Sequence, residues 1–468
     1  MVDLLKIIKD YKEVPAFIVM DGEESKTVSY EQFYEAICRC AYNLECAFGD
    51  LKGKHIGIYA NSGYEFVLVL AALLFERAVA VPLNNHESPD VIRYEIDNSD
   101  MEAIVVDEDL IQNIDILGKR TVGITELVKD DGTLANLKDF SDDEWDNLVA
   151  IVYTSGTTGI QKGVMLSAGN LFGETREVYD NAFPVDNYLG LRAFANLPYY
   201  HIGGISEWLL QMRKGCTVYL SIYPGNVLFD LEHQTIDVAV VIPATLKLWK
   251  KAIKSGHMDR LGNVKLVITG GAAADLDTVK IFLEHHIPYG QFYGMTEYSG
   301  IISSGFDCIS HLESVGRPNP SVKATIVDGE ICLSGPGFML GYYKNEEETK
   351  KVIDGDLLHT GDLGYIDEDG YMYITGRKKN LIILSNGENV SPEELENHLY
   401  KCPDIIECKV YEESDRICAL IYAEEGKENA VGDYIADLNT KLPIFKRIYK
   451  KTIQNEPLEK TGSGKIKR

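Results

Sequence analysis

The chain has 468 residues, two to three times the usual size of a domain, so we expect more than one hydrophobic core. Hydrophobic residues make up 45% and charged residues 25%, which is ordinary for a globular protein. The formal net charge of −26 is not ordinary, and it disfavours nucleic acid and anionic membranes as partners. An anionic substrate would therefore need a locally positive site.

The sequence carries no pattern of an export signal or a membrane span. The stretch at 1–17 mixes charged residues into its apolar run and lacks a small-residue cleavage pattern. The longest apolar run, Phe66–Phe75, has ten residues and is too short to cross a bilayer. The nine cysteines include no C-x-x-C pair, which fits reduced thiols. We therefore expect a cytoplasmic protein.

Short apolar runs alternate with helical patterns along the first 270 residues. We predict a helix at 64–77. We predict strands at 55–59, 78–82, 103–106, 148–153, 217–220, 238–242 and 265–269. Alternation of helices with continuously apolar strands predicts an α/β protein whose parallel sheets are covered on both faces.

The pattern changes near residue 303. Short β-like segments separated by Gly, Pro, Asp and Asn indicate an antiparallel, barrel-like part at about 303–375. A final segment has its own predicted helix at 391–400 and strands at 407–411 and 417–422. We place the domain boundary at the GRKKN string, which gives a large domain at 1–376 and a small domain at 377–468.

The strongest motif is YTSGTTGIQKGV at 153–164, directly after the apolar strand LVAIVY. Its glycines and hydroxyl residues supply backbone N–H and O–H donors, which suit phosphate oxygens, although a lone GTTG is equally typical of a surface turn. It is not a Walker P-loop, because Gln161 precedes Lys162 and Gly163 follows it, where Gly and Ser or Thr are required.

This loop resembles the phosphate loop of the acyl-adenylate-forming superfamily, which includes acyl-CoA synthetases, nonribosomal adenylation domains and firefly luciferases. Further strings resemble the motifs of that family, in the family's order: LPYYHIGG at 197–204, GGAA at 270–273, YGMTE at 293–297, GEICLSGPGFMLGY at 329–342, LHTGDLGY at 358–365, GRKK at 376–379, GENVSP at 387–392 and KTGSGKI at 460–466. The sequence departs from the family at Gln161, Ala168 and Asn380, and none of these positions carries a group that the chemistry needs.

The resemblance implies a large AMP-binding domain of two doubly wound α/β subdomains plus a small barrel-like one, and a mobile α+β C-terminal domain. It implies that ATP activates a fatty or aryl carboxylic acid to an acyl-adenylate with release of pyrophosphate. The acyl group then passes to the thiol of coenzyme A. The implied cofactors are ATP, Mg²⁺ and coenzyme A, and the implied enzyme is an AMP-forming acid–thiol ligase.

The resemblance also assigns roles to residues. Lys465 corresponds to the lysine that bridges the substrate carboxylate and the α-phosphate, and Thr296 and Glu297 complete the catalytic set. Glu297 and Thr158 are the implied metal ligands. The implied nucleotide-binding residues are Thr154, Ser155, Gly156, Thr157, Thr158, Gly159, Lys162, Gly271, Ala272, Tyr293, Gly294, Met295, Asp362 and Arg377. Tyr293 would offer its ring to adenine, although an aromatic residue there is equally typical of a core.

His201, Gly270 and Ala273 are the implied acyl-pocket residues, and Lys379 and Gly387 the implied hinge and thiol-channel residues. Gly387 is equally typical of a left-handed turn. No acidic residue occurs at 194–206, which disfavours an amino-acid substrate, because a buried ammonium needs a partner.

Two alternatives stay open: a ligase that loads the phosphopantetheine arm of a separate carrier protein, and a nucleotide-binding module without turnover. Ile383 stands where luciferases place a lysine, which disfavours oxidation chemistry. The segment 441–468 holds nine basic residues against two acidic ones, so the basic excess lies on the part that carries Lys465. We expect this charge to help the small domain approach the nucleotide.

Overall fold

The chain packs into two compact units. The computed structural model describes residues 4–21, 24–113, 118–129, 132–154, 161–173, 188–195, 197–220, 234–270, 276–305, 310–311, 313–460 and 466–467. The first unit comprises Met1–Ala274, Thr278–Ala324 and Leu333–Leu358. The second unit comprises Asp275–Asp277, Thr325–Cys332 and His359–Arg468. The predicted boundary between residues 376 and 377 lies inside the second unit and stays a prediction.

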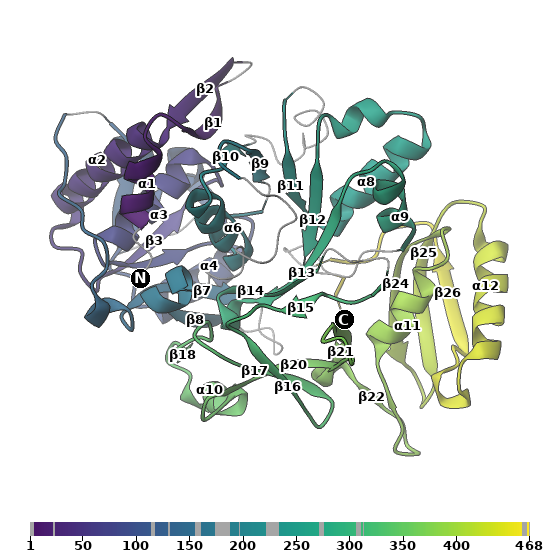
Figure 1. Cartoon of the computed structure of the whole chain (residues 1–468). Coiled ribbons are helices and arrows are strands. Elements are labelled where there is room, and N and C mark those ends of the chain that lie inside the picture. Colours follow the sequence, from purple (N-terminus) through teal and green to yellow (C-terminus); the bar gives the residue numbers. More distant parts are fainter. Residues whose placement is uncertain are drawn as a thin grey trace. The chain divides into compact units, whose positions relative to one another are not determined.

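One sheet of the first unit has seven strands in the order β18-β8-β7-β4-β3-β5-β6 (Figure 1). Its strands are β3 (His55–Tyr59), β4 (Val79–Pro82), β5 (Ala103–Val106), β6 (Arg120–Gly123), β7 (Leu148–Thr154), β8 (Lys162–Ser167) and β18 (Gly341–Tyr342). The five strands from β7 to β6 are parallel, whereas β8 and β18 add antiparallel pairs at one edge. The predicted strands of this region and their parallel arrangement are confirmed.

The other sheet of this unit has nine strands in the order β15-β14-β13-β12-β11-β9-β10-β1-β2. Its strands are β1 (Pro15–Asp21), β2 (Glu24–Ser29), β9 (Arg192–Ala195), β10 (Thr217–Leu220), β11 (Val238–Val241), β12 (Leu266–Gly270), β13 (Tyr289–Met295), β14 (Gly300–Gly305) and β15 (Arg317–Pro318). The strands from β1 to β13 are parallel. Trp249, Phe282 and Tyr289 pack in the core on this sheet.

The helices of the first unit follow the apolar patterns of the sequence. They are α1 (Leu4–Tyr11), α2 (Tyr30–Phe48), α3 (Tyr64–Phe75), α4 (Pro89–Asn98), α5 (Ile124–Leu127), α6 (Ile202–Arg213), α8 (Pro243–Lys254), α9 (Leu276–Glu284) and α10 (Glu346–Val352). Every residue of Phe66–Phe75 is buried, so this apolar run is a core helix. Of the helices in the described part of the chain, none combines the length and the apolar character that a membrane crossing requires.

The second unit contains most of a small sheet of short strands and a C-terminal core, whereas the strand Ile353–Asp354 of that sheet belongs to the first unit. A small sheet has the order β16-β17-β20-β19, and β21 pairs with β20. Its strands are β16 (Lys323–Val327), β17 (Glu330–Ser334), β19 (Ile353–Asp354), β20 (Leu357–Ile366) and β21 (Met372–Arg377). Beyond it lie β22 (Ile382–Ile383), β23 (Asn389–Val390), α11 (Pro392–Leu399), β24 (Ile405–Glu412), β25 (Ile417–Ala423), α12 (Glu428–Lys441) and β26 (Lys450–Gln454). The predicted antiparallel character of this region is confirmed.

The basic residues of the C-terminal segment are largely engaged in ion pairs within their own unit. Lys446 Nζ lies 2.7 Å from both carboxylate oxygens of Glu394. Lys450 and Lys460 pair at 2.5 Å with Glu413 and Glu407. These cations therefore stabilise the C-terminal unit locally. The expected contribution of their charge to nucleotide approach stays a prediction.

Arg77 fixes the segment that leads into β7. Helix α3 ends at Phe75, two residues before the prediction, and Arg77 adopts a left-handed backbone conformation with φ of 59°. Its guanidinium forms two hydrogen bonds with the Glu144 carboxylate, at 3.1 and 2.9 Å, and lies over the Phe140 ring. These donated bonds lower the pKa of Glu144 from 4.5 to about 2.

We expect Glu144→Gln to reduce the free energy of unfolding by about 1–3 kcal/mol at pH 7, because a charged hydrogen bond is lost from a largely buried site. The folded-state pKa is depressed, so the stabilisation is present above pH 4.5 and is lost as the pH falls towards 2. Denaturant unfolding at pH 7 and pH 3 should show the difference shrinking. The exposed Glu102→Gln is the control, and an equal difference at both pH values would contradict the role of this pair.

Candidate functional site

The two ends of the predicted phosphate loop face each other across a β-hairpin. Thr154 ends β7 and pairs directly with Lys162, which begins β8. Gly163 is required here, because a Cβ atom would lie 2.8 Å from Cγ2 of Ile151. A strand follows the loop, which separates it from a P-loop that leads into a helix. The predicted loop residues at 155–159 lie outside the described residues.

The side chain of Lys162 is directed into a small electrostatic network. Its Nζ atom forms an ion pair with Glu348 on α10 and lies 4.9 Å from the centroid of the Tyr342 ring. The Lys162 side chain is only 12% exposed. Hydrogen bonds from Lys162 and Lys351 lower the pKa of Glu348 from 4.5 to about 2, so this carboxylate is ionised at neutral pH. The sequence left open whether Lys162 points to solvent, and the structure shows that it does not.

The same network reaches the predicted metal ligand. Glu297 lies in a single 3₁₀ turn, Thr296–Tyr298, at the end of β13. The Tyr342 hydroxyl donates a hydrogen bond of 2.9 Å to Oε1 of Glu297, and the backbone carbonyl of Glu297 accepts from the amide of Met339. A half-buried carboxylate held in this way fits Mg²⁺, which prefers hard oxygen ligands.

The backbone around Gly294 is crowded. A Cβ atom at Gly294 would lie 1.9 Å from the carbonyl oxygen of Gly300, so no other residue fits. The pairing register shifts between Tyr293 and Gly294, Met295 ends the strand, and Thr296 begins the 3₁₀ turn. Tyr293 is 8% exposed, as expected of a core aromatic residue, and its contact with adenine stays a prediction.

The described acyl-pocket residues lie beyond the carboxyl ends of strands in the nine-stranded sheet. His201 is the N-cap of α6, which follows β9, and its ring centroid lies 4.8 Å from that of Tyr200. Gly270 is the last residue of β12, and a Cβ atom there would be 3.4 Å from the carbonyl oxygen of Phe292. Ligands of open α/β sheets bind at this edge. Gly271, Ala272 and Ala273 lie outside the described residues.

In the second unit, Asp362 and Arg377 lie opposite each other on β20 and β21. Nε of Arg377 is 2.5 Å from Oδ1 of Asp362, and the Asp362 side chain is only 4% exposed while that of Arg377 is 43% exposed. The structure thus brings together two residues that the sequence assigned to one nucleotide. A buried carboxylate beside a more accessible cation can accept hydroxyl hydrogens and attract an anion.

The remaining predicted residues of this unit lie in turns. Lys379 is exposed in a 3₁₀ turn, Lys378–Asn380. Gly387 has φ of 84° and donates its amide to the carbonyl of Leu384, so the turn interpretation is confirmed, whereas the thiol channel stays a prediction. Lys465 lies outside the described residues. Its described neighbours Lys460 and Ile466 pair as an antiparallel bridge.

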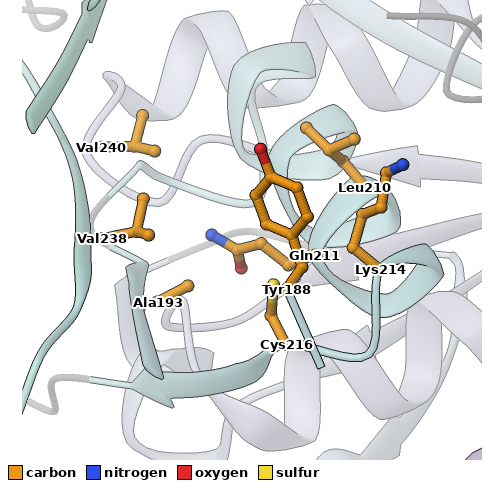
Figure 2. A pocket seen from close by; sticks show the side chains of 8 residues that line it. All are labelled: Tyr188, Ala193, Leu210, Gln211, Lys214, Cys216, Val238 and Val240. Carbon is orange, nitrogen blue, oxygen red and sulfur yellow. The ribbon is translucent and has the colours of Figure 1, made fainter. Parts of the chain in front are cut away.

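A small pocket lies at the opposite edge of the nine-stranded sheet from His201 and Gly270 (Figure 2). Ala193 is the second residue of β9, Val238 begins β11 and Cys216 precedes β10, so these residues place the pocket towards the amino ends of the strands. It is lined by Tyr188, Ala193, Leu210, Gln211, Lys214, Cys216, Val238 and Val240. Because its lining is mostly apolar and contains no predicted site residue, we do not assign it to the site.

Sequence reasoning missed three residues that hold the site in place. Tyr342 lies within a recognised motif but received no role, and Glu348 lies in an acidic helix turn that resembles a solvated face. Asn170 donates to the carbonyls of Pro336 and Phe338, which fixes the segment before Tyr342. The motif that contains Tyr342 was a usable signal. The other contacts join residues far apart in the sequence and leave no local pattern.

Comparisons with known proteins agree with this geometry. The profile of the family described as AMP-binding enzyme matches residues 6–343. The 2-succinylbenzoate–CoA ligase of Bacillus cereus is 29% identical over 409 residues, which cover 84% of this chain and 82% of that protein.

Solved structures resemble the whole chain. O-succinylbenzoate coenzyme A synthetase (MenE) from Bacillus subtilis, in complex with AMP, has a TM-score of 0.85 at 24% identity and covers 100% of this chain and 97% of that chain. The same enzyme in complex with ATP and magnesium ion has a TM-score of 0.83 at 25% identity and covers 99% and 98%. The chain therefore belongs to the AMP-binding enzyme family and is an adenylate-forming enzyme of the acyl-CoA synthetase type.

Proposed function

We propose that this enzyme uses ATP to activate an aryl carboxylic acid of the 2-succinylbenzoate kind and then transfers the acyl group to coenzyme A. The observation that carries the proposal is the network of Lys162, Tyr342 and Glu297, which joins the phosphate loop to the metal-ligand turn. The family match and the name of the Bacillus cereus relative, a 2-succinylbenzoate–CoA ligase, support it. In this proposal, ATP activates the acid in the presence of Mg²⁺, and coenzyme A accepts the acyl group.

Two anions must meet in the first step, the substrate carboxylate and the α-phosphate of ATP. The protein contributes by fixing their geometry and neutralising their charge. We assign the bridging cation to Lys465, and we assign phosphate contacts to Thr154, Thr296, Lys162 and the loop residues 155–159. Glu297, with Thr158, would hold Mg²⁺, which supplies charge neutralisation for the phosphates. Asp362 would accept hydrogens from the ribose hydroxyls, with Arg377 beside it.

The pocket residues favour a carboxylic acid without an ammonium group. The first acidic residue after the segment 194–206 is Glu207, which is buried and accepts a hydrogen bond of 2.8 Å from the Gln211 amide. Burial raises the pKa of Glu207 well above its ordinary value, and its side chain is engaged within α6. Among the described residues assigned to the pocket, His201 is the one that can carry a positive charge, which suits a second carboxylate on an aryl acid.

The relatives support an aryl acid rather than the fatty acid that the sequence left equally open. Their name also supports coenzyme A as the acceptor. A carrier protein with a phosphopantetheine thiol is the alternative acceptor, because it would present the same nucleophile to the same adenylate. A cytoplasmic location stays part of the proposal, and the scattered cysteines support it.

Release of pyrophosphate should be measured with the full chain, ATP and Mg²⁺ over a panel of 2-succinylbenzoate, benzoate, a fatty acid and an amino acid. We expect release that depends on the aryl acid, and formation of a thioester when coenzyme A is added. Preference for the fatty acid would contradict the substrate assignment. Acid-independent release, or none at all, would contradict the enzymatic proposal.

We expect Lys465→Ala to reduce adenylation by at least about a thousandfold, because an oriented charge at the reacting atoms is lost. Thioester formation from preformed acyl-adenylate should be nearly unchanged. Lys467→Ala is the matched control, since Lys467 pairs with Glu459 and should tolerate the change. Equal loss of both half-reactions in Lys465→Ala would contradict the assignment.

We expect Glu348→Gln to lower the KM for ATP by about fivefold, because Lys162 no longer has to leave a partly buried ion pair of about 1 kcal/mol before it binds phosphate. Glu347→Gln is the control, because Glu347 pairs with Lys351 and not with Lys162. An unchanged or raised KM in Glu348→Gln would show that the ion pair does not compete with the nucleotide.

A further inference from the structure

Three side chains of different chemistry converge on one face of the small sheet in the second unit. Glu330 and Cys332 are two residues apart on β17, so they point to the same side, and His359 lies on the neighbouring strand β20. Nδ1 of His359 is 3.4 Å from Sγ of Cys332 and 3.2 Å from Oε2 of Glu330. The three atoms all lie within 4.8 Å of one another.

Burial and backbone contacts preorganise this cluster. Cys332 is fully buried, and the Glu330 side chain is 4% exposed while that of His359 is 26% exposed. Oε1 of Glu330 accepts a hydrogen bond of 2.8 Å from the amide of Gly361, which aims Oε2 at the histidine. The histidine therefore provides a route to solvent for a cluster whose other members are held inside the sheet.

One hydrogen at Nδ1 of His359 cannot serve both of its neighbours. If Nδ1 is protonated, the sulfur of Cys332 and the carboxylate of Glu330 share that donor, and Oε2 of Glu330 also accepts from Lys378. If the Cys332 thiol donates to Nδ1 instead, the nitrogen has no hydrogen for the carboxylate. A nitrogen, a sulfur and a carboxylate oxygen that lie this close together are a set of atoms that a cation can bind.

The distances also fit a metal ion. Zinc bonds of about 2.3 Å to sulfur and 2.0–2.1 Å to nitrogen or oxygen place tetrahedral ligand atoms about 3.6 Å apart for S···N and about 3.3 Å for N···O. The observed 3.4 and 3.2 Å are close to these values. A thiolate and an imidazole select a borderline or soft ion, and Mg²⁺ prefers oxygen ligands.

We propose that Glu330, Cys332 and His359 form a binding site for one thiophilic divalent cation of the zinc class, separate from the Mg²⁺ that accompanies ATP. Binding converts the thiol to a thiolate, so one proton leaves Cys332 as the S–metal bond forms. Three protein ligands leave a fourth position for water. Nothing in this inference depends on the proposed substrate.

The ammonium group of Lys378 competes with a metal ion for the carboxylate of Glu330. Its Nζ atom lies 2.8 Å from Oε2 of Glu330, and its side chain is 58% exposed. An ammonium repels a nearby metal cation, so Lys378 must turn towards solvent when the ion binds. The residue precedes the predicted hinge Lys379, which places a metal-sensitive contact next to that hinge.

The test uses the full chain, treated with a chelator and then freed of it, and titrated with Co²⁺ as the probe. We expect a saturable thiolate-to-cobalt charge-transfer absorption with one ion per chain, and its displacement by Zn²⁺. Cys332→Ser should abolish this band, and His359→Gln should weaken or shift it. Absence of a saturable band in the wild-type chain would overturn the proposal, as would an unchanged band in Cys332→Ser.

Two further variants make the test specific. Cys402→Ser is the matched control, since it removes another buried thiol and should leave the band unchanged. Lys378→Gln should tighten Co²⁺ binding about fivefold or more, because the competing ammonium is removed. Unchanged affinity in Lys378→Gln would overturn the placement of the ion at Glu330. Unfolding curves of each variant identify any that do not fold, and His359→Gln then replaces Cys332→Ser as the deciding variant.

Discussion

The nucleotide side of this enzyme depends on the pairing of β7 with β8. β7 is the last parallel strand of its sheet, and its antiparallel partner β8 brings Lys162 back beside Thr154, so both ends of the phosphate loop are held by strand pairing. Gly163 permits this close approach, and the bidentate contact between Arg77 and Glu144 secures the segment that leads into β7. Fixed loop ends lower the conformational entropy that ligand binding costs.

From this hairpin, one chain of contacts crosses the first unit. Glu348 holds Lys162, the ring of Tyr342 lies next to the same ammonium, and the Tyr342 hydroxyl holds Glu297. A charge bound at the loop and a charge bound at Glu297 would therefore both interact with Tyr342. In the proposed reaction, such coupling would suit a substrate that carries phosphate and metal together.

The sequence predicted the parts of the fold that continuous apolar patterns determine. The strands at 55–59, 103–106 and 217–220 have the predicted bounds, because buried strands must be apolar on both faces. β8 was missed because KGVMLS contains a glycine and directly follows the loop motif, and we interpreted it as part of that motif. Several site residues lie at strand ends, but the roles of Tyr342 and Glu348 depend on contacts between residues that are 45 and 186 positions apart. The cluster of Cys332 and His359 was missed for the same reason, since register between strands decides which side chains meet.

The ion pairs of the C-terminal segment change how its excess of basic residues is interpreted. Lys446, Lys450 and Lys460 are each matched by a carboxylate of the same unit, so the apparent basic excess is largely neutralised at contact distance. Paired charges produce dipolar fields, which decay faster with distance than those of isolated charges. A diffusing anion therefore meets a far weaker long-range attraction than the count of lysines predicts. The expected help of this charge in nucleotide approach stays a prediction, and local pairing limits the distance over which it can act.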